Sequence, residues 1–210
     1  MCKIIYFSLV IVFVLLFVPR ASKAQDRVTI QTPSRETMKK IYDLAFPRLG
    51  PTFDPKIHEF IIDVLIDPSF HAPSQVSIVK YRDGRLIARR LDLRNRDEGL
   101  GDQVMSLIES HDRESDVKTL KLTETEVVKA LNVIETKVRI TRPFKEAVRR
   151  FFSCHTFKKE TRYWLDGADY EIWYVDGGSE LYFEHVESER PRASAPSLVI
   201  WAVTIMNTSQ

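Results

Sequence analysis

The sequence has 210 residues, of which 31 are Lys or Arg and 29 are Asp or Glu, and its formal net charge is +2. It holds only two cysteines, which excludes a fold stapled by several disulfides, and its hydrophobic content of 44% is enough for one core-forming domain. The nearly balanced charge gives no electrostatic reason to expect a nucleic-acid partner.

Residues 1–24 have the pattern of a cleaved signal peptide. Lys3 precedes an apolar-rich run over residues 4–18, and Ser22 and Ala24 are the small residues that a signal peptidase requires. As a helix this run would be about 22 Å long, short of the roughly 30 Å hydrocarbon layer. Cleavage after Ala24 removes three basic residues and no acid, so the net charge falls to −1. We therefore expect a protein exported to the periplasm or the extracellular space, with no membrane span after cleavage. The alternative is a retained N-terminal membrane anchor.

The first elements of the expected domain are predicted by a helix cap and an apolar run. After a flexible segment, residues 25–33, Ser34 caps a helix whose apolar side chains lie on one face. The apolar run 58–66 lies between prolines and is rich in β-branched residues, which favours a strand over a short helix.

The middle of the chain alternates between strand and helix signals. Asp83-Gly84 predicts a hairpin with a type I′ turn, and Thr123 with Glu126 predicts a capping box at the start of a helix. In chain order, the expected elements are strands 76–82 and 85–93, helices 100–108 and 123–131, strand 134–140 and helix 143–152.

The last third predicts three strands and a closing helix. The strands cover residues 160–165, 170–175 and 179–186, and short turns rich in Asp and Gly predict an antiparallel meander. Apolar residues at helical spacing predict a helix over 198–205. Because strands and helices do not alternate regularly, we expect an α+β fold: an antiparallel sheet of about five to seven strands, with helices packed mainly on one face. Residues 34–210 are expected to form one globular domain.

One face of the predicted meander gathers aromatic and charged residues. If the last turn has an even number of residues, Glu171 lies opposite Glu184 and Trp173 lies opposite Tyr182. These four side chains then point away from the side on which the apolar residues of the same strands lie.

Two interpretations of this face compete. Arg162 and Trp164 join it if the preceding turn is also even. In the first interpretation another segment of the chain covers part of the face, because large aromatic side chains are more often buried than displayed. In the second, Arg162, Trp164, Trp173 and Tyr182 form a binding surface for a protein, peptide or glycan ligand, since flat rings offer stacking area and carboxylates accept hydrogen bonds.

Sequence motifs give little support for catalysis. The nucleophile elbow, the zinc-protease motif, the phosphate loop and the dinucleotide-binding motif are absent, and the five histidines are not spaced as metal ligands. We therefore predict a non-catalytic binding module with no cofactor and no metal. The alternative is a hydrolase of a cell-envelope polymer or glycan, in which Glu171 and Glu184 act as the paired carboxylates that glycosidases require.

Overall fold

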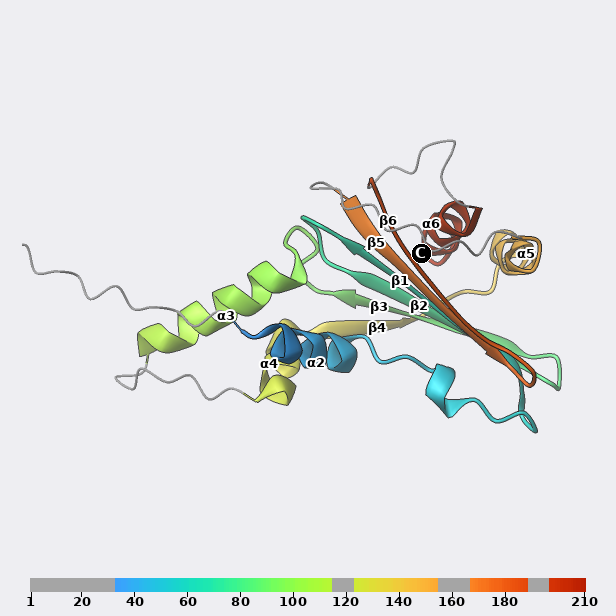
Figure 1. Cartoon of the computed structure of the whole chain (residues 1–210), viewed down its shortest axis with the longest axis horizontal. Coiled ribbons are helices and arrows are strands. Elements are labelled where there is room, and N and C mark those ends of the chain that lie inside the picture. The colour runs from blue at the N-terminus through green and yellow to red at the C-terminus, as the bar shows by residue number, and fades with distance from the viewer. Residues whose placement is uncertain (1–32, 115–122, 155–166, 189–196) are drawn as a thin grey trace, which may run out of the picture. The chain divides into compact units, whose positions relative to one another are not determined.

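The computed structural model describes residues 33–114, 123–154, 167–188 and 197–210. The described residues form five α-helices, one 3-10 helix and a six-stranded antiparallel sheet (Figure 1), which confirms the predicted α+β class. The helices are α2 (Arg35–Ala45), η1 (Gly50–Thr52), α3 (Leu100–Glu114), α4 (Glu124–Leu131), α5 (Arg142–Phe151) and α6 (Ser197–Thr208). The strands are β1 (His58–Pro68), β2 (Ser74–Tyr81), β3 (Leu86–Leu93), β4 (Val133–Lys137), β5 (Gly167–Asp176) and β6 (Glu180–Ser188).

The order of strands across the sheet is β4-β3-β2-β1-β5-β6, so the first strand of the chain lies inside the sheet. β5 pairs with β6 on one side and with β1 on the other. The sequence predicts residues 160–165 as the second neighbour of β5; these residues lie outside the described ranges, and β1 takes that position. The physical reason is that residues 60–65 of β1 are buried on both faces, which suits a strand between two partners.

Polar side chains fix the ends of the helices and one tight turn. The Ser34 hydroxyl accepts a hydrogen bond from the backbone N–H of Thr37, and Thr123 and Glu126 form both bonds of the predicted capping box. In the β2–β3 hairpin only Gly84, with φ of 90°, has a left-handed backbone, so the turn is a longer loop than the type I′ turn expected from the sequence. Within the described ranges, every helix is too short or too polar to cross a bilayer.

Two separate hydrophobic clusters cover the two faces of the sheet. Helices α5 and α6 pack on one face, over the alternate residues of β1 that include Ile62 and Val64. Helices α2, α3 and α4 pack on the other face, against Leu65 of β1 and Leu91 of β3 (Figure 1). The sequence predicts helices mainly on one face; the structure differs because the unbroken apolar run of β1 directs side chains into both layers.

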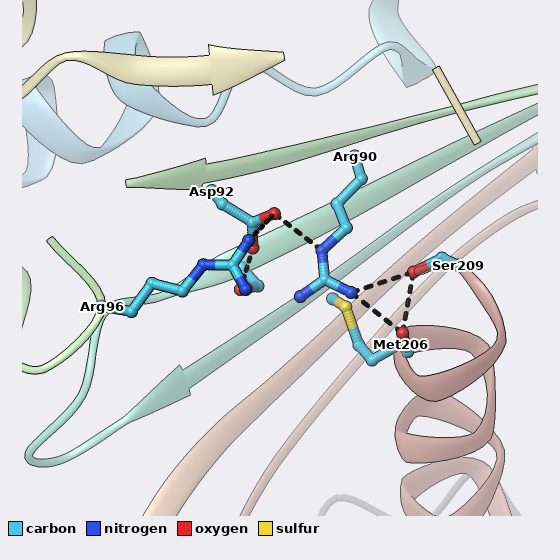
Figure 2. A network of polar contacts seen from close by, with 6 residues as sticks. Arg90, Asp92, Arg96, Met206 and Ser209 are labelled. Carbon is cyan, nitrogen blue, oxygen red and sulfur yellow. Dashed lines mark hydrogen bonds and ion pairs between the residues drawn. The ribbon is translucent and has the colours of Figure 1, made fainter. Parts of the chain in front are cut away.

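An ion-pair network fastens α6 to the sheet. Arg90 of β3 donates to Asp92 (2.8 Å, Nε to Oδ2) and, with its other end, to the Met206 carbonyl (3.0 Å) and the Ser209 hydroxyl (3.2 Å) at the end of α6 (Figure 2). Arg96 adds a second ion pair to Asp92 at 3.2 Å. Burial acts to raise the pKa of Asp92, but the hydrogen bonds and the charges of the two arginines outweigh it and hold that pKa below its usual value. The guanidinium thus bonds the Met206 carbonyl, one of the last carbonyl groups of the helix.

Candidate functional site

A groove of about 720 Å³ lies on the face of the sheet that carries α2. One wall comes from α2 and the residues that follow it, and the other from β1, β5 and β6. The groove contains the aromatic and acidic side chains that the sequence places on one face of the last two strands.

The strand pairing brings these side chains together. Glu171 lies opposite Glu184, and Trp173 lies opposite Tyr182, the pairs expected from an even-numbered turn. On the other side of β5, Asp63 of β1 is the partner of Trp173. Because side chains of a strand alternate between faces, all five of these residues point to the same face of the sheet.

β1 adds an acidic residue that the sequence analysis does not identify. Asp67 is the β1 partner of Asp169, two positions along β5 from Glu171. With Glu184 on β6, four carboxylates therefore lie next to one another across three strands.

A short strap, defined as residues 47–50, crosses the sheet between α2 and η1. The buried carboxylate of Asp63 accepts hydrogen bonds from the N–H groups of Leu49 (2.8 Å) and Gly50 (2.9 Å). A strap carbonyl accepts a third bond of 2.8 Å from the guanidinium of Arg89 on β3. Burial raises the pKa of Asp63, although these hydrogen bonds and the Arg89 charge act in the opposite direction. The strap is therefore tied to β1 and β3 by side chains of the sheet.

The strap carries a cation over the aromatic residues of the groove. The Arg48 guanidinium lies 4.7 Å from the centre of the Trp173 ring, within the range of a cation–π contact. Trp173 in turn stacks on Tyr182, with ring centres 5.4 Å apart and planes 26° apart. Trp173 is half-buried, whereas Tyr182 is 51% exposed. One end of the stack is thus covered by the chain itself and the other is open to solvent.

The four carboxylates repel one another, and Asp67 and Glu171 are partly removed from water. Burial raises the pKa of Asp67 to about 7, and the charges of Asp169 and Glu171 add to the shift, although the interaction with Tyr42 opposes it. Burial also raises the pKa of Glu171 and of Asp169, and the charge of Glu184 adds to both shifts. None of the ion pairs between described residues includes Asp67, Asp169 or Glu171. The site holds negative charge that the protein neutralises only in part.

Helix α2 directs a hydroxyl group at these carboxylates. The Tyr42 oxygen is buried and makes no hydrogen bond of regular geometry with the described residues, but it interacts with the Asp67 carboxylate as a hydrogen-bonding partner. Burial, followed by the charges of Asp67 and Glu171, raises the pKa of Tyr42 well above its usual value, so the side chain stays a neutral hydroxyl.

The structure brings together four of the side chains predicted for the site: Glu171, Trp173, Tyr182 and Glu184. Arg162 and Trp164, the other two, lie outside the described residues. The contributions of Arg48, Tyr42 and Asp67 were not predicted, because no motif connects α2 or β1 with β5. The available signal was a set of isolated acidic residues, at positions 63 and 67, in or next to an otherwise apolar run.

Metal chemistry finds no support in the described ranges, where no three His, Cys, Asp or Glu side chains are arranged to hold a metal ion. Comparison of the chain with models of protein families, with curated proteins and with solved structures finds no match.

Proposed function

We propose that the protein is an exported, non-catalytic binding module that takes a protein, peptide or glycan ligand in the groove between α2 and the sheet. The observation that carries this proposal is the stack of Trp173 on Tyr182, whose outer ring is 51% exposed beside a row of carboxylates. A ligand that covers the open ring gains stacking area, and the neighbouring carboxylates accept its hydrogen bonds.

The groove is organised before a ligand arrives. Tyr182 is held by its stacking on Trp173 and by a long hydrogen bond of 3.4 Å from its hydroxyl to Glu171. Trp173 is held from above by Arg48 of the strap. Because the rings are already fixed, a ligand has little side-chain entropy to remove, which favours binding.

The test is a binding screen on arrays of peptides and of glycans with the wild-type protein and two variants. Tyr182→Ala removes the open ring of the groove. Phe70→Ala is the matched control, since Phe70 is 57% exposed and does not line the groove. We expect ligands of the wild type to be lost by Tyr182→Ala and kept by Phe70→Ala. Ligands that bind both variants equally well would contradict the proposal.

A second candidate function is hydrolysis of a cell-envelope polymer or glycan by Glu171 and Glu184. It is favoured by the raised pKa of Glu171, which burial causes first and the charge of Glu184 second, as a general acid requires. Directly opposite residues of neighbouring strands have Cβ atoms about 5 Å apart, close to the carboxyl separation of retaining glycosidases. Product release from purified cell-wall polysaccharide that Glu171→Gln abolishes would support this function, and absence of product with the wild type would exclude it for that polymer.

A further inference from the structure

The groove already holds one organic cation, which belongs to the protein. The Arg48 guanidinium lies over Trp173 and also acts to lower the pKa of Glu171 through its charge. This contact covers the inner ring of the stack only. The outer ring, Tyr182, offers a second aromatic face next to Glu171 and Glu184. The same chemistry that receives Arg48 is therefore available to a cation from outside.

The carboxylates of the groove select for positive charge. A neutral ligand that covered Glu171 would remove its carboxylate from water without a counter-charge, which is unfavourable. An anionic ligand would meet three carboxylates of adjacent strands that line the groove, Asp67, Glu171 and Glu184. The cations of α2 that line the groove, Arg35 and Lys39, are both exposed.

A buried hydroxyl gives independent evidence for a polar ligand group. The Tyr42 oxygen lies in the lining of the groove and is buried; it makes no hydrogen bond of regular geometry with a described residue, and its hydrogen-bonding interaction is with the Asp67 carboxylate. Buried hydroxyl groups are normally satisfied. A cationic group placed beside Asp67 would also donate to the Tyr42 oxygen, which keeps its acceptor capacity while its own proton is directed at the carboxylate.

We infer that the groove binds an arginine or lysine side chain of a peptide segment in a partner protein, with the cationic group beside Asp67 and Glu171 and the aliphatic stem against Tyr182. This inference rests on the proposed function and names its ligand class. A peptide is favoured over a small free amine because a groove of about 720 Å³ has room for more than one side chain, and because the ring face offers apolar area to a stem.

The experiment is isothermal titration of the full chain with a capped tri-arginine peptide and with the matching tri-citrulline peptide. Citrulline has the shape of arginine without its charge, so this comparison needs no variant of the protein. We expect saturable binding of tri-arginine and no detectable binding of tri-citrulline. Equal binding of the two peptides, or no binding of tri-arginine, would overturn the inference.

Variants then assign the binding to the groove. Glu171→Gln/Glu184→Gln removes two charges with little change in shape, and we expect it to weaken tri-arginine binding by at least about tenfold. Glu59→Gln/Glu109→Gln is the matched control, because both residues are exposed and neither lines the groove. We expect the control to bind within about twofold of the wild type at equal ionic strength. An equal loss in both double variants would mean unspecific attraction and would overturn the inference.

Two further outcomes separate this inference from the proposed function. Agmatine, a small amine with one guanidinium, is expected to bind more weakly than the peptide; equal affinity would overturn the peptide as the ligand. If tri-arginine fails to bind while an array ligand is lost by Tyr182→Ala, the cationic ligand is wrong and the binding module stands. If tri-arginine and every array ligand bind Tyr182→Ala as they bind the wild type, both fail.

Discussion

The two faces of the sheet use aromatic residues in different ways. On the α5–α6 face, Trp201 is 3% exposed, packs 4.8 Å from Phe151 and donates its indole N–H to the Ala147 carbonyl at 2.6 Å. On the α2 face, Trp173 and Tyr182 stack beside carboxylates, and one of the two rings is half open to solvent. On the α5–α6 face the aromatic ring is closely packed and its polar N–H group is hydrogen-bonded. On the α2 face the rings lie beside carboxylates whose charge is only partly neutralised.

We propose that this difference separates a face shaped by stability from a face shaped by ligand binding. Carboxylates with raised pKa values destabilise the folded protein at neutral pH, because their ionised form is better solvated in the unfolded chain. Such groups persist where function requires them, and stability is then supplied elsewhere in the fold.

Trp201→Ala should cause the largest loss of stability. The side chain is buried in the α5–α6 cluster, so its removal leaves a cavity and abolishes the hydrogen bond to the Ala147 carbonyl. We expect Trp201→Ala to decrease the free energy of unfolding by about 3–5 kcal/mol, measured by urea denaturation. A decrease below about 1 kcal/mol would show that this face is not the packed one.

Arg90→Ala should lower the free energy of unfolding by about 2–3 kcal/mol, because it leaves Asp92 buried with one fewer counter-charge and removes the bonds to the Met206 carbonyl and the Ser209 hydroxyl at the end of α6. Arg96→Ala is the matched control: it pairs with the same carboxylate, but its own side chain is exposed, so we expect less than about 1 kcal/mol. Urea denaturation measures both variants. Equal losses of unfolding free energy would contradict the role of Arg90 in holding α6 on the sheet.

Asp67→Asn should stabilise the protein at high pH, opposite in sign to the first two substitutions. Burial raises the pKa of Asp67 in the folded state to about 7, so the folded protein binds a proton more tightly than the unfolded chain. The stability of the wild type therefore falls as the pH rises from about 4 to about 7 and is level above that.

The advantage of Asp67→Asn over the wild type should thus grow by about 1–3 kcal/mol between pH 5 and pH 8, a value lowered for the openness of the groove to water. Urea denaturation at the two pH values measures this advantage. Asp169→Asn is the control, and because Asp169 is exposed, we expect its advantage to change less with pH. An advantage that shrinks with rising pH would contradict the burial of Asp67 beside Tyr42, Asp169 and Glu171.

Tyr182→Ala should have the smallest effect on stability. Half of the side chain is already in water, so we expect a change within about 1 kcal/mol and an unaltered circular dichroism spectrum. A loss comparable to that of Trp201→Ala would mean that the ring belongs to the core and is not a contact surface.

Local patterns predicted much of the fold. The caps at Ser34 and Thr123 fixed two helix starts, and the alternation of β5 and β6 predicted which side chains share a face, including the pairs Glu171–Glu184 and Trp173–Tyr182. These features depend on residues close in sequence, for which spacing carries the information.

The remainder depends on contacts between distant residues. The pairing of β1 with β5 joins residues roughly a hundred positions apart, so Asp67 and Glu171 become neighbours through topology alone. The strap brings Arg48 onto Trp173 because Asp63, buried inside β1, binds two strap N–H groups. Neither the run of β1 nor the loop after α2 encodes this contact as a periodic pattern.

The most direct test of the account compares the two faces in one experiment. The chain has three tryptophans, whose indole N–H signals can be assigned in a nitrogen–proton correlation spectrum by substitution with phenylalanine. On titration with the capped tri-arginine peptide, we predict that the Trp173 signal shifts in a saturable way while the Trp201 signal stays in place. A Trp173 signal that does not move at saturating peptide, or one that moves equally in Glu171→Gln/Glu184→Gln, would contradict a cation-binding groove on the α2 face.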